Sequence, residues 1–472
     1  MKTIKISYTN KSITNNGNFQ GWGTSLCWWA NRIGYSPILT KKAAELFYSE
    51  KGLNLNIMRY NIGGGDNPKH KHIKRTDSMV PGWLYFNKET NEYQYDYSAD
   101  INQLNVLKAC YDATKHPYVE VFSNSPPYFM TKSGCSSGGR NPKKDNLKED
   151  CYSAFAEYLA HVTEYINNKL NITVSSVSPM NEPNTDYWHY KSEKQEGCHF
   201  SPGESQNRII LETSRAIKDR GLNNIEMVAS DETATDKAII AFENYSDEVK
   251  QTIDRISTHT YGTERIHELN TLMKKEGFNL WMSETDWGDV SGENADEMGA
   301  ALWLAEKIIS DINSLSPSAW VLWQTIDYHK SKSGYMGNSD SGIPDATKGF
   351  WGLAFCDHDE MNIILTQKYY AMGQFSRYIN VGDTILHCHE NALCAANEKE
   401  VKLVVVNSKA ADFPITIDLT DTGNHFNFVD TIRTSGSISS GESWAELPTD
   451  TVNHNVYTTS LKGNSITTFI FK

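Results

Sequence analysis

The chain has 472 residues, of which 39% are hydrophobic, and it carries a formal net charge of −13 at pH 7. A chain of this length can bury a large core and should hold more than one domain. The negative charge argues against nucleic acid or an anionic membrane as a partner. No apolar stretch of the sequence is long enough to span a bilayer.

The cysteines and the N-terminus carry no recognisable cofactor or targeting signal. The eight cysteines are scattered, with no Cys-x-x-Cys pair. His387-Cys388-His389-Glu390 has metal-binding residue types, but neighbours in this alternating segment point to opposite faces, so we interpret it as structural. We therefore expect no metal and no cofactor. Residues 1–6 alternate as in a strand and not as in a signal peptide, so the protein is either cytoplasmic or secreted with its signal peptide removed.

Short apolar runs alternate with helical stretches through most of the chain. We expect strands over residues 19–25, 55–61, 118–123, 172–177, 225–230, 255–259, 279–284 and 319–324. We expect helices over residues 41–51, 102–115, 148–170, 204–220, 236–253, 264–275, 297–313 and 366–379. Eight strands that alternate with helices predict an α/β fold, the (β/α)8 TIM barrel.

The two ends of the chain show a different pattern of apolar and polar residues. Residues 4–13 alternate between apolar and polar side chains, and so do short runs near 401–405, 415–419 and 466–470. This pattern predicts a side all-β sandwich. We expect the last strand to share one small sheet with the N-terminal strand, so that the sandwich comprises residues 1–16 and 381–472 and the catalytic barrel comprises residues 17–380.

Two glutamates stand where predicted barrel strands stop. Glu182 follows the fourth strand and precedes Pro183, which cannot continue a central strand, and Glu284 ends the seventh. Both should lie on the carboxyl-terminal rim, where barrels of this type carry their chemistry. Glycosidic bond cleavage uses two carboxyl groups, one that donates a proton and one that attacks carbon or activates water. The pair therefore predicts a glycosidase.

Four motifs support the prediction of a glycosidase. They are Gly21-Trp22-Gly23, Asn181-Glu182-Pro183, the strand-end Glu284, and residues 368–376 in the last barrel helix. Together they resemble glycoside hydrolase family 30, a retaining family with a (β/α)8 barrel fused to a side β-sandwich, and the resemblance covers nearly the whole chain. Residues 21–30 and 195–200 look more narrowly like the endo-β-1,6-galactanase branch of that family.

The resemblance implies that Glu182 is the acid/base and Glu284 the nucleophile of a double displacement on β-1,6-galactan or its oligosaccharides. Glu182 must then be protonated while Glu284 is ionised, which requires environments that separate their pKa values. The family further implies that Asn181 hydrogen-bonds the sugar 2-hydroxyl, and that Arg59 keeps Glu284 ionised. Tyr261 would donate a hydrogen bond to Glu284.

Five aromatic and polar residues are further candidates for sugar contacts. Trp323, at the end of the eighth strand, would form the floor of the subsite. The others are Trp22, Asp66, Asn124 and Trp287. The loop 130–140, which contains Cys135, matches no motif.

Alternatives to this interpretation stay open at the level of the sequence. The chain could be another retaining β-glycosidase of the family, of the β-1,6-glucanase, xylanase or β-glucosidase type, or an inactive carbohydrate-binding protein on the same scaffold. The intact glutamate pair favours an enzyme, because an inactive binding protein would not need to keep either carboxylate. A metal-dependent hydrolase would need a His/Asp cluster at the strand ends, which the sequence lacks. We expect a monomer whose partner is a carbohydrate.

Overall fold

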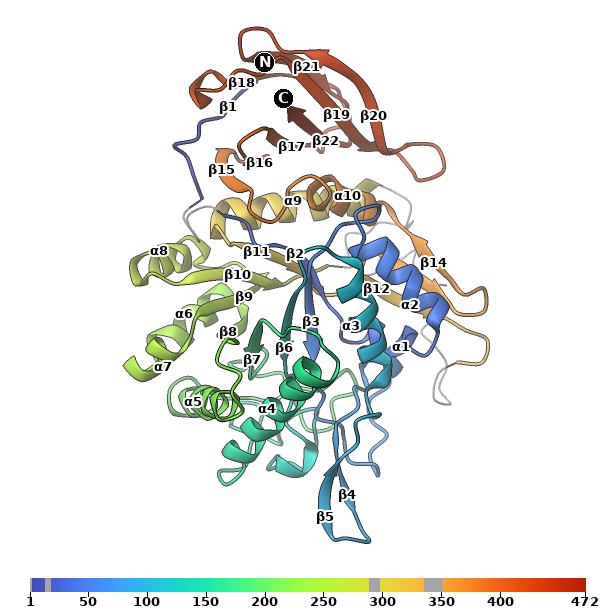
Figure 1. Cartoon of the computed structure of the whole chain (residues 1–472), viewed down its shortest axis with the longest axis vertical. Helices are drawn as coiled ribbons and strands as arrows, with labels where there is room; N and C mark the ends of the chain where they lie inside the picture. The colour runs from blue at the N-terminus through green and yellow to red at the C-terminus, as the bar shows by residue number, and fades with distance from the viewer. Residues whose placement is uncertain (1, 13–17, 288–297, 335–350) are drawn as a thin grey trace.

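The computed structural model describes residues 2–12, 18–287, 298–334 and 351–472 (Figure 1). Its largest unit is a closed barrel of parallel strands in the order β2-β3-β6-β7-β8-β9-β10-β11. These strands are β2 (Gly21–Ser25), β3 (Ile57–Asn61), β6 (Tyr118–Phe122), β7 (Ser176–Ser178), β8 (Glu226–Ala234), β9 (Arg255–Gly262), β10 (Asn279–Glu284) and β11 (Ala319–Leu322). The predicted (β/α)8 barrel is confirmed.

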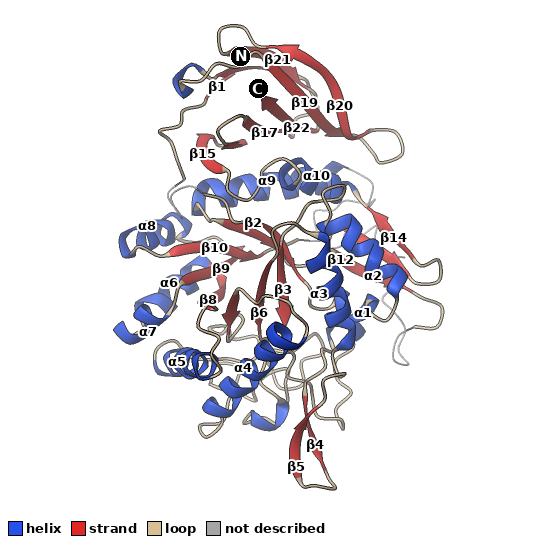
Figure 2. Cartoon of the chain, viewed as in Figure 1, coloured by secondary structure: helices blue, strands red, loops and turns tan. Residues whose placement is uncertain are grey.

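Helices surround the barrel on its outer side (Figure 2). They are α1 (Trp29–Ile33), α2 (Pro37–Ala43), α3 (Ile101–Ala113), α4 (Tyr152–Lys169), α5 (Glu204–Asp219), α6 (Thr235–Glu243), α7 (Asp247–Thr252), α8 (Ile266–Glu276), α9 (Met298–Leu315) and α10 (Gln367–Ser376). No helix in the described part of the chain has the length and apolar character to cross a membrane.

Two predicted boundaries are wrong for local reasons. The fourth strand was expected over 172–177, but it covers only Ser176–Ser178, because the chain before it still bonds to the end of α4: Ile172 N–H donates to the Ile166 carbonyl at 3.4 Å, and Val174 N–H donates to Asn167 Oδ1 at 3.2 Å. The helix expected over 41–51 begins earlier, at Pro37, because the Ser36 hydroxyl caps it by accepting a backbone N–H at 3.3 Å. The chain then continues as a π-helical segment over Ala44–Tyr48.

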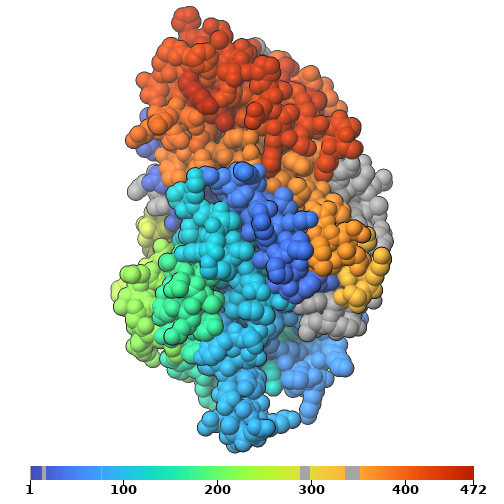
Figure 3. Space-filling view, turned by 45° about the vertical axis from the view of Figure 1, so that its right-hand side comes forward, coloured from blue at the N-terminus to red at the C-terminus, as the bar shows by residue number. Residues whose placement is uncertain are grey.

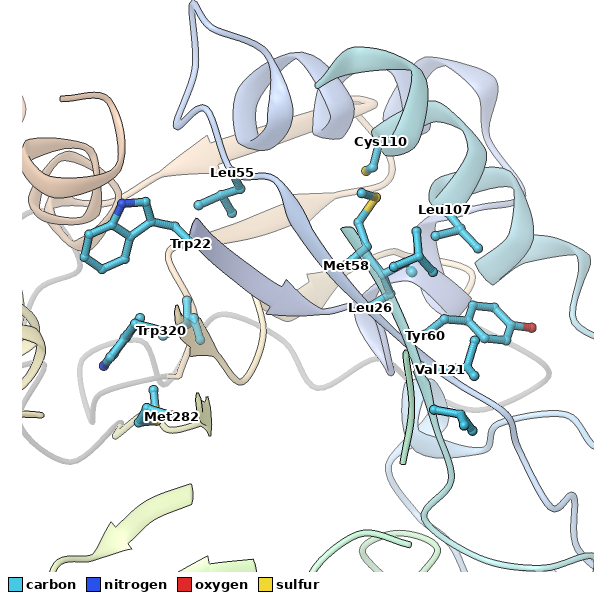
Figure 4. Packing of buried hydrophobic residues seen from close by; sticks show 14 of the residues in the cluster. Trp22, Leu26, Leu55, Met58, Tyr60, Leu107, Cys110, Val121, Met282 and Trp320 are labelled. Atoms are coloured by element: carbon cyan, nitrogen blue, oxygen red, sulfur yellow. The ribbon is translucent and has the colours of Figure 1, made fainter. Parts of the chain in front are cut away.

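Successive side chains of β3 point alternately to the outside and to the inside of the barrel. Met58 and Tyr60 point outward and lie near Leu107 of α3 (Figure 4). Ile57 belongs to a buried cluster with Trp281 of β10. Arg59 is on the same side of the strand as Ile57, two residues closer to the carboxyl end, so a charged group lies just beyond this apolar layer.

The C-terminal part of the chain forms two antiparallel-rich sheets beyond α9 and α10, at one end of the molecule (Figures 1 and 3). The larger sheet contains β15 (Thr384–His389), β16 (Ala392–Ala396), β17 (Val401–Asn407), β22 (Ser465–Phe471), β19 (Phe428–Ser435) and β20 (Glu442–Thr451), in that order. The smaller sheet contains β1 (Lys2–Lys5), β18 (Phe413–Asp418) and β21 (Val456–Leu461). A shared apolar core joins them, in which Ile4, Ile417 and Phe469 are all buried.

The N-terminal strand does not pair as expected. β1 covers only Lys2–Lys5 and runs parallel to β18, with Lys2 opposite Ile415. It cannot join β22, because β22 already pairs with β17 on one edge and with β19 on the other. The division into residues 1–16 with 381–472 and residues 17–380 stays a prediction.

Two small sheets on the barrel side were not expected from the sequence. One is the projecting hairpin of β4 (Leu84–Asn87) and β5 (Glu92–Tyr95), at the lower end of Figure 1. The other contains β12 (Ile326–Lys330), β13 (Ala354–Asp357) and β14 (Asn362–Leu365). The first strand of this second sheet follows β11 closely, so it extends the rim beside the eighth barrel strand.

Candidate active site

Glu182 occupies a strained position on the rim. It lies four residues beyond β7 with a φ of 46°, a left-handed conformation that costs a residue with a side chain about 1–3 kcal/mol. Its N–H donates to the Asp231 carbonyl at 2.8 Å, and its own carbonyl accepts from Trp188 Nε1 at 3.1 Å. These bonds hold the turn that aims the carboxyl group inward.

The Glu182 carboxyl group is almost fully buried, at 6% exposure. Its Oε2 accepts a hydrogen bond from the Tyr187 hydroxyl at 2.5 Å, and its Oε1 lies 3.2 Å from Nδ1 of His259. Tyr187 follows Glu182 by five residues in the loop after β7, whereas His259 comes from β9. The carboxyl group is thus oriented both by its own loop and by a neighbouring strand.

Glu284 ends β10 and is 4% exposed. Its Oε1 accepts from the Tyr261 hydroxyl at 3.0 Å, and its Oε2 accepts from Arg59 Nη1 at 3.2 Å. The same guanidinium bonds Asp231 at 2.6 Å and Glu120 at 3.0 Å, entirely buried. Burial lowers the pKa of Arg59, but these three carboxylates more than offset it and raise the pKa above the ordinary value.

His259 lies between the two glutamates. Its Nδ1 is 3.2 Å from Glu182 and 3.6 Å from Glu284, while its Nε2 is 3.3 Å from Asp231 Oδ1. Burial by itself lowers the pKa of His259, but Glu284, Asp231 and Glu182 together raise it to about 10. The imidazole is therefore a cation at neutral pH.

The charges of this buried cluster do not cancel. Among the buried groups, three cations (Arg59, Arg255 and His259) face four carboxyl groups (Glu120, Asp231, Glu182 and Glu284), and Arg255 also lies 3.4 Å from the partly exposed Glu226. One further proton on the glutamate pair would make the buried groups neutral, and buried sites favour neutrality.

The pKa values of the two glutamates are separated, but in the opposite order from the one expected. Burial and the charge of Glu182 raise the pKa of Glu284 to about 7, against the opposing cations His259 and Arg59. Burial also acts to raise the pKa of Glu182, but hydrogen bonds from His259 and Tyr187 outweigh it and lower the value. The cause is the closer approach of the His259 cation to Glu182.

A cleft of about 470 Å³ opens onto both carboxyl groups. Its walls are rich in aromatic rings, among which Trp28 and Trp323 meet edge to face at 5.0 Å. Tyr261 and Trp351 lie 5.7 Å apart, and Arg75 stacks 4.5 Å over the Trp28 ring. The lining residues include Trp28, Arg75, Glu182, Tyr187, Trp188, Gln195, Thr233, Tyr261, Glu284, Trp323, Asp327 and Trp351. Such walls suit the apolar C–H faces of sugar rings, with polar groups placed to fix their hydroxyls.

The structure brings some predicted site residues together. Arg59 and Tyr261 contact Glu284 directly, and Trp323 lines the cleft. Asn181 is buried next to Glu182, and its Oδ1 has no partner within the described residues. Trp287 is 42% exposed and lies 6.5 Å from Trp351, at the edge of the cleft.

Other predicted sugar contacts lie elsewhere. Trp22 is a core residue, because its ring packs 4.7 Å from Phe19 and its Nε1 donates to the Ile379 carbonyl at 2.8 Å. Asn124 is buried and does not line the cleft within the described residues. Asp66 bonds the imidazole of His70 at 3.1 Å, away from the glutamate pair.

His259 and Asp231 were missed as site residues. The sequence nevertheless contains a signal for both, since one ends the predicted sixth strand and the other directly follows the predicted fifth. The rule that selected Glu182 and Glu284, a polar side chain at the carboxyl end of a barrel strand, would have selected these two as well. Trp28 lies within the motif of residues 21–30 but was not singled out there, and Arg75 lies in a loop to which no sequence signal points.

Comparisons with known proteins agree with this geometry. The family model for O-Glycosyl hydrolase family 30 matches residues 1–336. An endo-beta-1,6-galactanase from Hypocrea rufa is 28% identical over 481 residues, covering 97% of this chain and 92% of that protein. An exo-beta-1,6-galactobiohydrolase from Bifidobacterium longum subsp. longum is 25% identical over 532 residues, covering 86% of this chain but 34% of that protein. The solved catalytic domain of a xylanase C from Talaromyces cellulolyticus has a TM-score of 0.71 at 17% identity and covers 100% of both chains.

Proposed function

Since this chain belongs to glycoside hydrolase family 30 and is a glycoside hydrolase, we propose that it cleaves β-1,6-linked galactose in galactan or its oligosaccharides with retention of configuration. The single observation that carries the mechanism is the glutamate pair. Together with His259, each glutamate offers an oxygen within 4.8 Å of the other. Retaining enzymes hold their carboxyl groups about 5–5.5 Å apart, whereas inverting enzymes need about 6.5–9.5 Å.

In the first step Glu182 gives its proton to the glycosidic oxygen as Glu284 attacks the anomeric carbon. The bond to the leaving sugar breaks and a glycosyl ester of Glu284 forms. In the second step Glu182 takes a proton from water, the water oxygen bonds the anomeric carbon, and Glu284 leaves as a carboxylate. Arg59 and Tyr261 stabilise that carboxylate through the bonds at 3.2 and 3.0 Å.

The proton for the first step has a source beside Glu182. In the free protein His259 carries it on Nδ1, one hydrogen bond of 3.2 Å from Glu182 Oε1. We infer that His259 passes this proton to Glu182 as Glu284 bonds to the anomeric carbon, since that same step consumes the Glu284 charge that holds the imidazole cationic. In the second step Glu182 returns to His259 the proton that it takes from water. This shift reconciles the pKa order of the free protein with the roles of the two glutamates.

The proposed substrate is inferred from the similarity of this chain to two relatives. Two relatives that match most of this chain are named for action on β-1,6-linked galactose, one endo-acting and one exo-acting. The aromatic cleft accepts a sugar ring but selects no linkage by itself. Other retaining activities of the family, such as β-1,6-glucanase or xylanase, are therefore the alternatives to test.

The test is product analysis on a panel of β-1,6-galactan, β-1,6-glucan, xylan and aryl β-glycosides. We expect the highest kcat/KM on β-1,6-galactan, and the early size distribution of its products separates endo from exo action. Proton NMR taken before mutarotation should show the β-anomer first. Initial release of the α-anomer would contradict the assignment of Glu284 as nucleophile. Faster cleavage of xylan or β-1,6-glucan than of β-1,6-galactan would show that the substrate assignment is wrong. Binding without any turnover would favour a carbohydrate-binding protein.

A further inference from the structure

A second polar cluster lies in the loops beyond the barrel rim. Asp66, His70 and His72 come from the loop after β3, and Cys135 comes from the long loop between β6 and α4. Each offers one ligand atom, and these four atoms all lie within 4.8 Å of one another. The glycosidase mechanism uses none of them, and the loop with Cys135 matched no sequence motif.

We propose that these four residues bind a zinc ion. In a tetrahedral zinc site, bonds of about 2.0–2.3 Å place the ligand atoms roughly 3.3–3.8 Å apart. Here Asp66 Oδ2 lies 3.1 Å from His70 Nδ1, 3.6 Å from His72 Nδ1 and 4.0 Å from Cys135 Sγ. The distances from Asp66 are therefore close to those of an assembled site.

The environment of His72 supports this assignment. Its side chain is nine-tenths buried, at 10% exposure, and its Nδ1 has no hydrogen-bond partner within the described residues. Its other nitrogen, Nε2, lies 2.8 Å from the Ser137 hydroxyl, and Cys135 Sγ lies 3.1 Å from that hydroxyl and 3.7 Å from Nε2. With an ion on Nδ1, Ser137 would be the outer partner that holds the second ring nitrogen, and Cys135 Sγ would turn from this hydroxyl toward the ion. Asp66 is oriented similarly, since its Oδ1 accepts the backbone N–H of Ser136 at 3.1 Å.

The donor types select the metal. One thiolate, two imidazoles and one carboxylate suit Zn²⁺, whereas Ca²⁺ and Mg²⁺ prefer oxygen donors alone. Cys135 is a free and fully buried thiol. As thiolate and carboxylate, Cys135 and Asp66 would neutralise the dication. Asp66, predicted from the sequence as a sugar contact, is reassigned to this site.

A second thiol–imidazole cluster offers a matched control. His329, Cys356 and His358 also lie within reach of one another, all buried. There, however, the Arg32 guanidinium lies 3.2 Å from His358 Nδ1, and the other nitrogen of His358 is 3.1 Å from His329. A cation beside the donors opposes metal binding, so we expect no zinc at this second cluster.

Zinc binding would stabilise one wall of the active-site cleft. The loop with Cys135 bonds the cleft loop twice: Gly197 N–H donates to the Ser136 carbonyl at 2.9 Å, and Gly139 N–H donates to the Trp188 carbonyl at 3.0 Å. Trp188 itself lines the cleft. The ion would therefore tie the β3 and β6 loops together behind this wall, at a distance from the reacting carboxyl groups.

The test is metal content, which is read without any substrate and so is independent of the proposed activity. The purified full-length chain is stripped with a chelator, incubated with zinc alone, passed over a desalting column and analysed by mass spectrometry. We expect about one zinc per chain in the parent protein, none in Cys135→Ser or His72→Gln, and about one in Cys356→Ser. A parent that retains no zinc, or zinc that is lost in Cys356→Ser but kept in Cys135→Ser, would overturn the proposal.

Cobalt substitution of the parent protein keeps the test decisive if a variant fails to fold. A Cys–His–His–Asp site should give cobalt(II) the intense visible bands of tetrahedral coordination together with a thiolate charge-transfer band. Zinc should also raise the Tm of the stripped parent by several degrees, because a ligand that binds only the folded state stabilises it. Weak octahedral cobalt bands and an unchanged Tm would contradict the site.

Discussion

Glu182 and Glu284 can each be changed to glutamine with almost no change in shape, which separates their chemistry from their packing. We expect Glu182→Gln and Glu284→Gln to lower kcat/KM on galactan by about 10²–10⁴-fold or more, since in the proposed mechanism each group acts on the reacting atoms. Circular dichroism and Tm should stay near the parent values. Glu243→Gln is the matched control, because Glu243 is exposed at the end of α6 and belongs to none of the contacts described for the charged cluster.

The two variants should differ on an aryl glycoside with an acidic leaving group. Such a leaving group needs no proton, so Glu182→Gln should form the glycosyl-enzyme quickly and then stall, whereas Glu284→Gln should stay inactive. Losses of only a few-fold in both variants would refute the assignment, and a large fall in Tm would indicate structural roles.

His259 affects the site through its charge. His259→Gln keeps a hydrogen-bond donor but removes the cation that lies 3.2 Å from Glu182 and 3.6 Å from Glu284. Without that cation the ionised forms of both carboxyls are less stable, so their pKa values rise. We expect the acid limb of the kcat/KM profile to move to higher pH by at least about one unit.

The control for this pH experiment is His199→Gln. His199 is also buried, but its Nδ1 bonds the Thr185 carbonyl at 2.6 Å and it lies outside the charged cluster. The acid limb of the kcat/KM profile of His199→Gln should stay at the pH of the parent protein. An unshifted limb in His259→Gln would show that the imidazole is neutral in the working enzyme.

Helix α10 packs against β20 at Gly373, where the ring of Trp444 lies against the helix. A Cβ on Gly373 would lie 2.1 Å from the Trp444 ring, and Trp444 donates to the Tyr370 carbonyl at 2.7 Å. Alanine normally favours a helix over glycine, by about 1 kcal/mol. Here we expect Gly373→Ala to destabilise the protein by about 1–3 kcal/mol, because overpacking outweighs helix propensity.

Chemical denaturation measures this effect. The same substitution in a Trp444→Leu background removes the clash and should cost less than it does in the parent, which a double-mutant cycle will show. Equal costs in both backgrounds would mean that α10 does not depend on this close approach to the C-terminal sheets.

For the whole molecule, buried carboxyl groups set how stability varies with pH. Burial raises the pKa of Glu232 from 4.5 to about 8 and that of Asp100 from 3.8 to about 7, despite hydrogen bonds that act in the other direction. Each group keeps its proton in the folded chain at pH values where the unfolded chain has released it. The folded state therefore binds more protons, and stability falls as pH rises from about 4 to 8.

His259 acts in the same direction at higher pH. Its pKa is raised from 6.5 to about 10, so its stabilising charge is complete below about 6.5 and is lost between these two values. We expect Tm to decrease steadily as pH rises from about 5 to 9. Glu232→Gln should reduce the slope between pH 5 and 8 by about one proton, while Glu243→Gln, on the exposed end of α6, should leave it unchanged. A Tm that rises from pH 6 to 9 would contradict this account.

The barrel and the family could both be predicted from the amino-acid sequence. Strand and helix periods are properties of the local sequence, so they can be recognised before the tertiary arrangement is known. The position of Glu182 and Glu284 on one rim also followed locally, because all parallel strands of a barrel end on the same side. The four motifs then gave the family resemblance, which the family model confirms.

Which side chains meet across that rim could be learned only from the folded chain. Arg59 contacts Asp231 and Glu284 because barrel closure brings β3, β8 and β10 around one interior. No local period distinguishes a tryptophan that plugs the core, as Trp22 does, from one that lines the cleft, as Trp323 does. Likewise Asp66 and Cys135 are 69 residues apart in sequence, and they meet only because two rim loops fold over each other. Contacts of this kind depend on how distant segments pack, and this information is not present in any single stretch of the chain.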